Sequence, residues 1–239
     1  HYPLRRQRQM CIRDRPWVSC NSSAATLLTW YRNNVLHLFA APSLVALLVS
    51  RAKAGIQERH LAEQFRIIYP FIAQELTINE ALALEPVLQA LSGMGLITRR
   101  DGYLRPASKP GEPYTQLAQL STSLLEMLQR LYVVICIANQ ASLERDELRS
   151  ISQASARKLA RLFGLQGAEF SEDRLFDLFI DGLISKQYLS IDERDRLIAS
   201  SLLQQVAEQA AEQVIEPAIH QALLRVVASE LEKRGPSST

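Results

Sequence analysis

Apolar residues recur at three- and four-residue spacing in one segment after another, and this periodicity is the strongest constraint on the fold. In residues 57–76 the apolar stripe consists of Leu61, Phe65, Ile68 and Ile72. A helix with such a stripe is stable when that face packs against other elements. The sequence therefore predicts a mainly α, multi-helix domain. We expect helices over residues 24–50, 57–76, 84–91, 114–139, 143–163 and 173–180, and one or two helices over residues 194–233.

Prolines and apolar positions refine this expectation. A proline inside a helical pattern interrupts or bends the helix, so we expect an interruption at Pro42 and a bend near Pro217. The same periodicity also predicts which side chains form the core. These are Leu28, Leu38, Leu47, Phe65, Ile68, Leu88, Leu91, Leu125, Leu128, Val134, Leu159, Leu162, Phe176, Phe179, Val206 and Leu223.

Short extended segments break the helical pattern in two places. Residues 96–104 contain Asp101-Gly102, a pair that supplies the positive φ angles of a two-residue hairpin turn. A second extended piece, residues 188–191, follows Gly182-Leu183-Ile184, which is similar to Gly95-Leu96-Ile97. Duplication explains this similarity, and so does the simple reuse of good turn residues. We therefore expect one or two minor β-hairpins.

Proline, glycine and arginine divide the chain into parts. Residues 107–113, with two prolines and a glycine, predict a loop between a helical subdomain with a small β-hairpin (21–106) and a C-terminal helical subdomain (114–239). Residues 1–20 are expected to be non-native, because the string RRQRQMCIRDR (5–15) resembles translated adapter sequence. The first 15 residues hold five of the 27 basic residues and one of the 25 acidic residues, so the remainder is weakly acidic. No general attraction to nucleic acid follows.

Sequence patterns typical of catalysis and metal binding are missing. The chain contains no G-x-S-x-G elbow, no glycine-rich phosphate loop and no H-E-x-x-H pair. Its three cysteines form neither a disulfide framework nor a metal-ligand spacing. We therefore expect no metal, no cofactor and no catalytic residue. The longest apolar stretch, residues 35–49, is shorter than the roughly 20 residues that cross a bilayer, so we expect no membrane span.

One polar cluster interrupts an apolar helix. It consists of Tyr31, Arg32, Asn33 and, one turn after Asn33, His37. Helical spacing places Arg32 among apolar neighbours, and a buried guanidinium without a partner is strongly destabilising. The cluster is therefore a candidate contact for a substrate or for another domain. An internal ion pair or an arginine that extends to the surface explains it equally simply.

The residues around this cluster resemble a known family. The Tyr31–Asn34 block, His37 and Pro42-Ser43-Leu44 are similar to a stretch of the bacterial membrane-bound glycerol-3-phosphate 1-O-acyltransferases. Three weaker similarities follow in the order of the family. They are Tyr69-Pro70 before Glu75-Leu76, the segment 95–98, and the segment 168–170 ahead of a strand in which Gln187-Tyr188-Leu189 departs modestly from a Gly-Tyr-Ile pattern.

This resemblance implies the C-terminal region only. In such enzymes a His followed five positions later by Asp acts as the general base, and none of His1, His37, His60 or His220 has that Asp. For the intact enzyme the resemblance implies acyl transfer from acyl-ACP or acyl-CoA to the sn-1 hydroxyl of glycerol 3-phosphate, the first step of phospholipid synthesis. It implies a location at the cytoplasmic face of the bacterial inner membrane with peripheral membrane contact, no nucleic acid, and the catalytic domain as the partner. This fragment alone is expected to be inactive.

Two other readings compete with this one. Residues 57–104 fit a winged-helix-type DNA-binding regulator whose wing carries Arg99, Arg100 and Arg105. Against it, the helix at 84–91 contains Glu85 and neither Lys nor Arg. A structural helical scaffold is the third reading. The charged run 144–149 fits an exposed helix start.

Overall fold

The computed structural model describes residues 22–233, except 53, 80, 110, 166–169 and 171. The side chains of residues 22–30, 32 and 33 also lie outside the described part. The chain divides into two units, residues 1–34 and residues 35–239. Of the first unit the structure describes the beginning of helix α2, and every other element belongs to the second unit.

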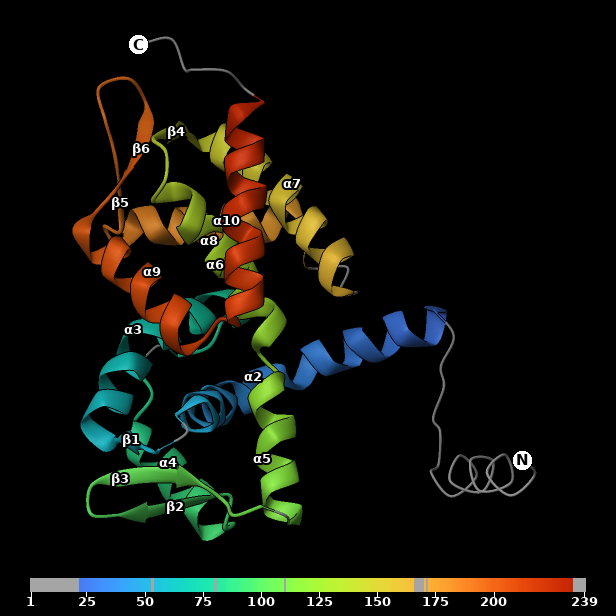
Figure 1. The fold of residues 1–239 in the computed structure, drawn as a ribbon, viewed down its shortest axis with the longest axis vertical. Coiled ribbons are helices and arrows are strands. Elements are labelled where there is room, and N and C mark those ends of the chain that lie inside the picture. The colour runs from blue at the N-terminus through green and yellow to red at the C-terminus, as the bar shows by residue number, and fades with distance from the viewer. Residues whose placement is uncertain are drawn as a thin grey trace, which may run out of the picture. The chain divides into compact units, whose positions relative to one another are not determined.

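The described elements are mainly helices, with two small antiparallel sheets of three strands each (Figure 1). The predicted fold class, mainly α with minor hairpins, is confirmed. In chain order the elements are α2 (Ser22–Arg51), β1 (Ile56–Gln57), α3 (Glu58–Leu76), α4 (Leu84–Gly93), β2 (Ile97–Arg100), β3 (Tyr103–Pro106), α5 (Glu112–Thr122), α6 (Leu125–Ala138), β4 (Leu143–Glu144), α7 (Arg145–Phe163), α8 (Asp173–Ser185), β5 (Leu189–Ile191), β6 (Arg196–Ala199), α9 (Ser201–Gln213) and α10 (Pro217–Glu232).

Helix α6 lies at the centre of the second unit. Every residue from Met127 to Ala138 is buried, and helices α7, α8, α9 and α10 all contact α6. A helix that is apolar around its whole circumference is stable only when other elements surround it. The sequence LYVVICIA (131–138) therefore dictates that the neighbouring helices cover α6 on all sides.

The second unit contains the same arrangement twice. Each copy has a helix, a short strand, two helices and a hairpin, and the short strand pairs with the second hairpin strand to give the orders β1-β3-β2 and β4-β6-β5. This order and pairing define a winged-helix unit. We call residues 40–106 the first copy and residues 127–199 the second copy; Figure 1 shows their two hairpins at opposite ends of the second unit.

Local geometry matches between the copies. Helices α3 and α7 both have 19 residues, and each is followed by a residue in the left-handed region, Thr77 (φ 55°) and Gly164 (φ 67°). After α4 and α8, Gly95 and Gln187 are also left-handed and lead into the first hairpin strand. Gly95 therefore corresponds to Gln187, and the similarity between Gly95-Leu96-Ile97 and Gly182-Leu183-Ile184 is out of register.

The two copies contact each other through α3 and α8. The Gln74 side-chain amide donates a hydrogen bond to the Leu178 carbonyl (3.1 Å), and Phe71 packs edge-on against Phe179 with ring centroids 5.5 Å apart. A Cβ atom on Gly182 would lie 2.3 Å from the end of the Gln74 side chain, so a larger residue there would force that side chain to move. The copies thus form one packed body.

A buried ion pair strengthens this junction. Arg130 of α6 binds Glu75 of α3, and their side chains are only 4% and 11% exposed. Burying either charge without the other would be strongly unfavourable, because the lost hydration is compensated only by the partner.

Several sequence predictions differ from the structure. Helix α2 continues through Pro42, residues 114–139 form two helices that break at Ser123-Leu124, and the strands β4 and β6 replace parts of predicted helices. Of the one or two helices predicted over residues 194–233 the structure has two, α9 and α10, and α10 begins at Pro217, where the bend was predicted. The pairing of β4 and β6 with each other takes these residues out of the helices. The proposed division at residues 107–113 stays a prediction, although α5 already begins at Glu112.

Most predicted core residues are buried or pack against the core, and two predictions were wrong. Leu38 is 64% exposed and Leu162 is 65% exposed. Leu162 lies in the last turn of α7, beyond the buried stripe that ends at Leu159. Leu38 lies on the opposite side of α2 from buried Leu36 and Ala40. Leu28 lies outside the residues whose side chains are described.

The Arg130–Glu75 pair leads to a stability prediction. Replacing Arg130 by Ala should lower the free energy of unfolding by about 3 kcal/mol, because Glu75 would remain charged and buried. Urea denaturation measures this change. The double substitution Arg130→Met with Glu75→Gln should lower the free energy of unfolding by less. Arg100→Ala, at a side chain 83% exposed, is the control and should leave it unchanged. A single Arg130→Ala variant as stable as the control would contradict the role of the pair.

Candidate functional site

The predicted polar cluster lies on α2. The side chains of Tyr31 and His37 are exposed, whereas those of Arg32 and Asn33 lie outside the described part of the chain. The structure therefore does not test whether the four residues act together, and the contact site stays a prediction.

An apolar surface lies on the same helix. Val35, Leu38 and Phe39, which we call the α2 apolar face, are all exposed and lie on one side of α2. Helical spacing continues this side into Val45 and Val49, which are fully buried in the core. The apolar stripe is thus longer than the core that covers it, and its uncovered part is suited to contact another surface.

The wing of the first copy is held by ion pairs. Arg99 of β2 donates hydrogen bonds to Glu58 of α3 (2.7 Å) and to Glu85 of α4 (2.6 Å). The hydrogen bond from Arg99, together with one from Gln89, holds the pKa of Glu85 below its ordinary value. The guanidinium of Arg105 lies 5.4 Å from the centroid of the Tyr103 ring. Arg99 is thus engaged by the protein itself, which does not favour the DNA-binding reading.

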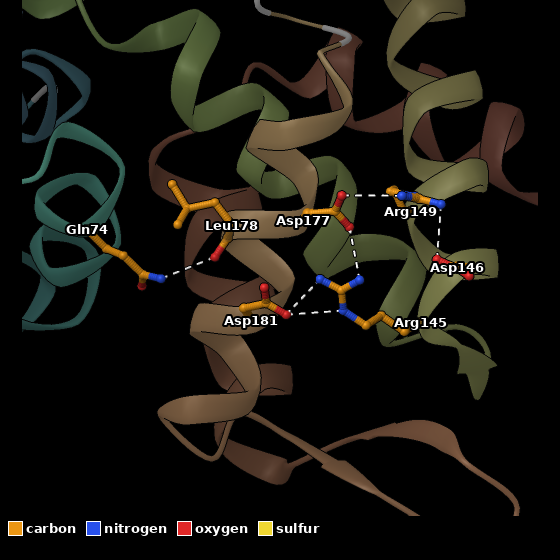
Figure 2. Close-up of polar contacts among 7 residues, drawn as sticks. All are labelled: Gln74, Arg145, Asp146, Arg149, Asp177, Leu178 and Asp181. Carbon is orange, nitrogen blue, oxygen red and sulfur yellow. Dashed lines mark hydrogen bonds and ion pairs between the residues drawn. The ribbon is translucent and has the colours of Figure 1, made fainter.

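The second copy joins α7 to α8, the counterparts of α3 and α4, through a different arrangement of charges (Figure 2). Arg145 of α7 binds Asp181 (2.8 Å) and Asp177 (3.2 Å) of α8, and Arg149 binds Asp177 (3.3 Å). In the first copy the counterparts of Arg145 and Asp177 are Glu58 and Glu85, two acids bridged by Arg99. The charged run at 144–149, which the sequence suggested was only a solvated helix start, therefore fastens α7 to α8.

The buried Tyr132 has a structural partner in the core. The hydroxyl of Tyr132 forms a 2.8 Å hydrogen bond with Nδ1 of His220, and burial raises the pKa of Tyr132. Burial also raises the pKa of the Cys136 thiol to about 11. Among the described residues, no group of three or more His, Cys, Asp or Glu side chains could hold a metal ion.

Two helical stretches are long and apolar enough to cross a membrane, judged by length and composition alone. They are Asn34–Arg51, of which 56% is buried inside the fold, and Glu112–Ala138, of which 72% is buried. The core helices of soluble proteins have the same properties, so these stretches are weak evidence for a span.

The fold and its surfaces define a class of protein. The second unit is a pair of winged-helix copies whose α2 apolar face is suited to contact another protein surface. Its clearest polar clusters, within the described ranges, join helices to one another. The class is thus a mainly helical protein built from two winged-helix copies.

Comparison with known proteins then identifies the family. A model of the "Glycerol-3-phosphate acyltransferase C-terminal region" matches residues 7–192. The chain belongs to this family, as the resemblance predicted, and therefore to the C-terminal region of an acyltransferase. The match begins inside residues 1–20, whose non-native origin stays a prediction.

Relatives with the same name cover most of the chain. The glycerol-3-phosphate acyltransferase of Pseudomonas paraeruginosa (strain PA7) is 35% identical over 193 residues, which is 77% of this chain. The proteins of that name from Pseudomonas fluorescens (strain Pf0-1) and Pseudomonas syringae pv. syringae (strain B728a) are each 33% identical, over 193 and 197 residues. The matched regions span only 23% of the length of these relatives. No solved structure matches the chain.

The buried thiol gives a direct test of the core. With a pKa of about 11, only about one thousandth of Cys136 is thiolate at pH 8, and its side chain is buried. We expect a thiol reagent to label Cys136 far more slowly in the native chain than in the urea-unfolded chain, as peptide mass mapping would measure. Equal labelling rates in the two states would contradict the burial of α6.

Proposed function

We propose that this chain is the non-catalytic C-terminal region of an enzyme that transfers a fatty acyl group to the sn-1 hydroxyl of glycerol 3-phosphate. The donor is acyl-ACP or acyl-CoA, and the reaction is the first step of phospholipid synthesis at the cytoplasmic face of the bacterial inner membrane. The family match and the names of the relatives support the activity. The fragment itself is proposed to be inactive, since none of its histidines is followed five positions later by the aspartate that orients the general base in this family.

One observation carries the role of the region within that enzyme. The α2 apolar face is exposed, yet the same side of the helix is buried one turn further on. Exposed side chains such as Leu38 and Phe39, side by side on one helix, favour a surface that is covered in the intact protein. We propose that the catalytic domain of the same enzyme covers this face.

The neighbouring polar cluster fits the same contact. In sequence, Tyr31, Arg32 and Asn33 precede the segment that carries the apolar face, and His37 lies within that segment. Polar groups commonly surround the apolar centre of a protein interface, where they fix its register. We propose that these residues contact the catalytic domain or the phosphate of its substrate. We also propose that the intact enzyme makes peripheral contact with the membrane.

A chimeric enzyme tests the proposed function. The matching region of the Pseudomonas paraeruginosa relative would be replaced by residues 21–239 of this chain, and acyl transfer to glycerol 3-phosphate would be measured with acyl-CoA. We expect the chimera to be active, and the relative without this region and the isolated chain to be inactive. An isolated chain that transfers acyl groups, or a relative that needs no C-terminal region, would refute the proposal.

A matched pair of substitutions tests the docking face. Leu38→Glu in the chimera should lower acyl transfer about tenfold or more, because a buried carboxylate without a partner disrupts an apolar contact. Leu162→Glu is the control, since Leu162 is exposed to the same extent at the end of α7. In the isolated chain neither substitution should change the urea midpoint by much. Equal activity of the two variants would show that Leu38 makes no contact in the enzyme.

A further inference from the structure

A cavity of about 300 Å³ lies in the first copy, between α3 and the segment that leads into α4. One wall comes from α3, and residues 81, 82 and 84 form the other. The α3 residues recur at three- and four-residue spacing, so they share one side of the helix. They are Ala62, Phe65, Arg66, Tyr69 and Pro70. The Tyr69-Pro70 pair, to which the proposed function gives no role, therefore borders a cavity.

The cavity has apolar surface on both sides. The rings of Phe65 and Tyr69 stack with their centroids 4.7 Å apart, and each side chain is only 4% exposed. Leu82 and Leu84 provide the apolar surface of the opposite wall. The volume lies at the lower end of the range of ligand pockets. It suits a molecule with a single ring rather than a long acyl chain.

Two hydrogen-bond donors lie three positions apart in this wall. The hydroxyl of Tyr69 forms no hydrogen bond within the described part of the chain, although its side chain is almost completely buried. Burial raises the pKa of Tyr69, so the hydroxyl stays protonated at neutral pH and is able to donate. Arg66 is exposed and forms no ion pair with any described residue. The described wall thus has one cation, a free hydroxyl and no acid, which favours an anionic ligand.

The second copy closes the corresponding place with its own side chains. The equal length of α3 and α7 makes Gln153 the counterpart of Arg66. Counting back from the left-handed residue before each hairpin makes Asp173 the counterpart of Ala81. Gln153 donates a hydrogen bond to Asp173. In the first copy an alanine stands in place of that aspartate, so the guanidinium of Arg66 keeps its hydrogen-bonding capacity for a ligand.

The aromatic pair also distinguishes the first copy from the second. By the same alignment of α3 with α7, Ser152 and Ala156 occupy the positions of Phe65 and Tyr69. Both are fully buried, so the core of a winged-helix copy packs with small residues at these positions. The scaffold therefore does not require the stacked rings, and a binding role explains them.

We propose that this cavity binds a small aromatic carboxylate. The carboxylate accepts hydrogen bonds from Arg66 and from the hydroxyl of Tyr69, because a guanidinium matches the planar carboxylate group. The ring of the ligand lies against Leu82 and Leu84, where it displaces water from apolar surface. The inference does not depend on the proposed acyl transfer, because it rests on contacts within the first copy.

Nuclear magnetic resonance of the isotope-labelled whole chain tests the site. The probe is benzoate, with sodium chloride added to keep the ionic strength constant. We expect saturable shifts of the amides of Ala81, Leu82 and Leu84. Acetate has the carboxylate without the ring, and benzamide has the ring without the charge, so each should bind at least about tenfold more weakly. Equal affinity for the three probes, or tighter binding of octanoate than of benzoate, would overturn the proposed ligand class.

Variants of the two donors show whether the proposed contacts hold the ligand. Tyr69→Phe keeps the stacked rings and removes only the hydroxyl, so the affinity for benzoate should fall by about three- to tenfold. Arg66→Gln should lower it by about tenfold or more, because it removes a charge-assisted hydrogen bond. Arg59→Gln is the matched control, since it makes the same change of charge at an exposed position of α3 and should leave the affinity unchanged.

A substitution copied from the second copy provides an independent check. Ala81→Asp introduces a carboxylate that competes for Arg66, so benzoate binding should fall at least about tenfold while the urea midpoint does not decrease. The proposal is overturned if the wild type shows no saturable shifts with benzoate. It is overturned equally if Arg66→Gln and Ala81→Asp both bind benzoate as tightly as the wild type.

Discussion

The buried helix α6 is the constraint on which the rest of the second unit depends. Its residues from Met127 to Ala138 are all buried, and all but Gln129 and Arg130 are apolar, so an arrangement that leaves one side of the helix open to water would be unfavourable. Within it, the buried Arg130 is paired with Glu75 of the first copy, which offsets the cost of burying its charge. The second copy therefore requires the first to complete its core, and the winged-helix copies form one cooperative body with α9 and α10 as the outer cover.

Much of this fold could be predicted because it is encoded locally. The stripe of Leu61, Phe65 and Ile72 determines the buried face of α3 wherever the helix packs. Asp101-Gly102 likewise forms the turn of the first hairpin from two residues alone. By contrast, β1 and β4 have two residues each, and their partners are far away in the chain: Ile56 pairs with Leu104, and Leu143 with Leu197. Two residues carry no periodicity, so these strands could not be recognised from sequence.

The surfaces were harder to predict than the core, because periodicity does not say what covers an apolar stripe. Leu38 fits the pattern of a core position and is exposed in this chain. Charges have the same ambiguity: Arg145 and Arg149 look solvated in sequence, and the aspartates they bind lie on another helix. For Arg32 and Asn33 the contact site is a hypothesis from the sequence alone, because their side chains lie outside the described part of the chain.

The two copies fasten corresponding helices with incompatible charges, and this has a consequence for how the chain can change. One copy uses two acids around Arg99; the other uses Arg145 against Asp177. A genetic exchange that placed α4 of the first copy beside α7 of the second would set Glu85 against Arg145, which keeps a pair of opposite charges. An exchange that placed α3 beside α8 would set Glu58 against Asp177. Ile191 would then stand where the first copy has the bridging Arg99. An exchange of the second kind is therefore disfavoured, which helps to keep the two copies distinct in sequence.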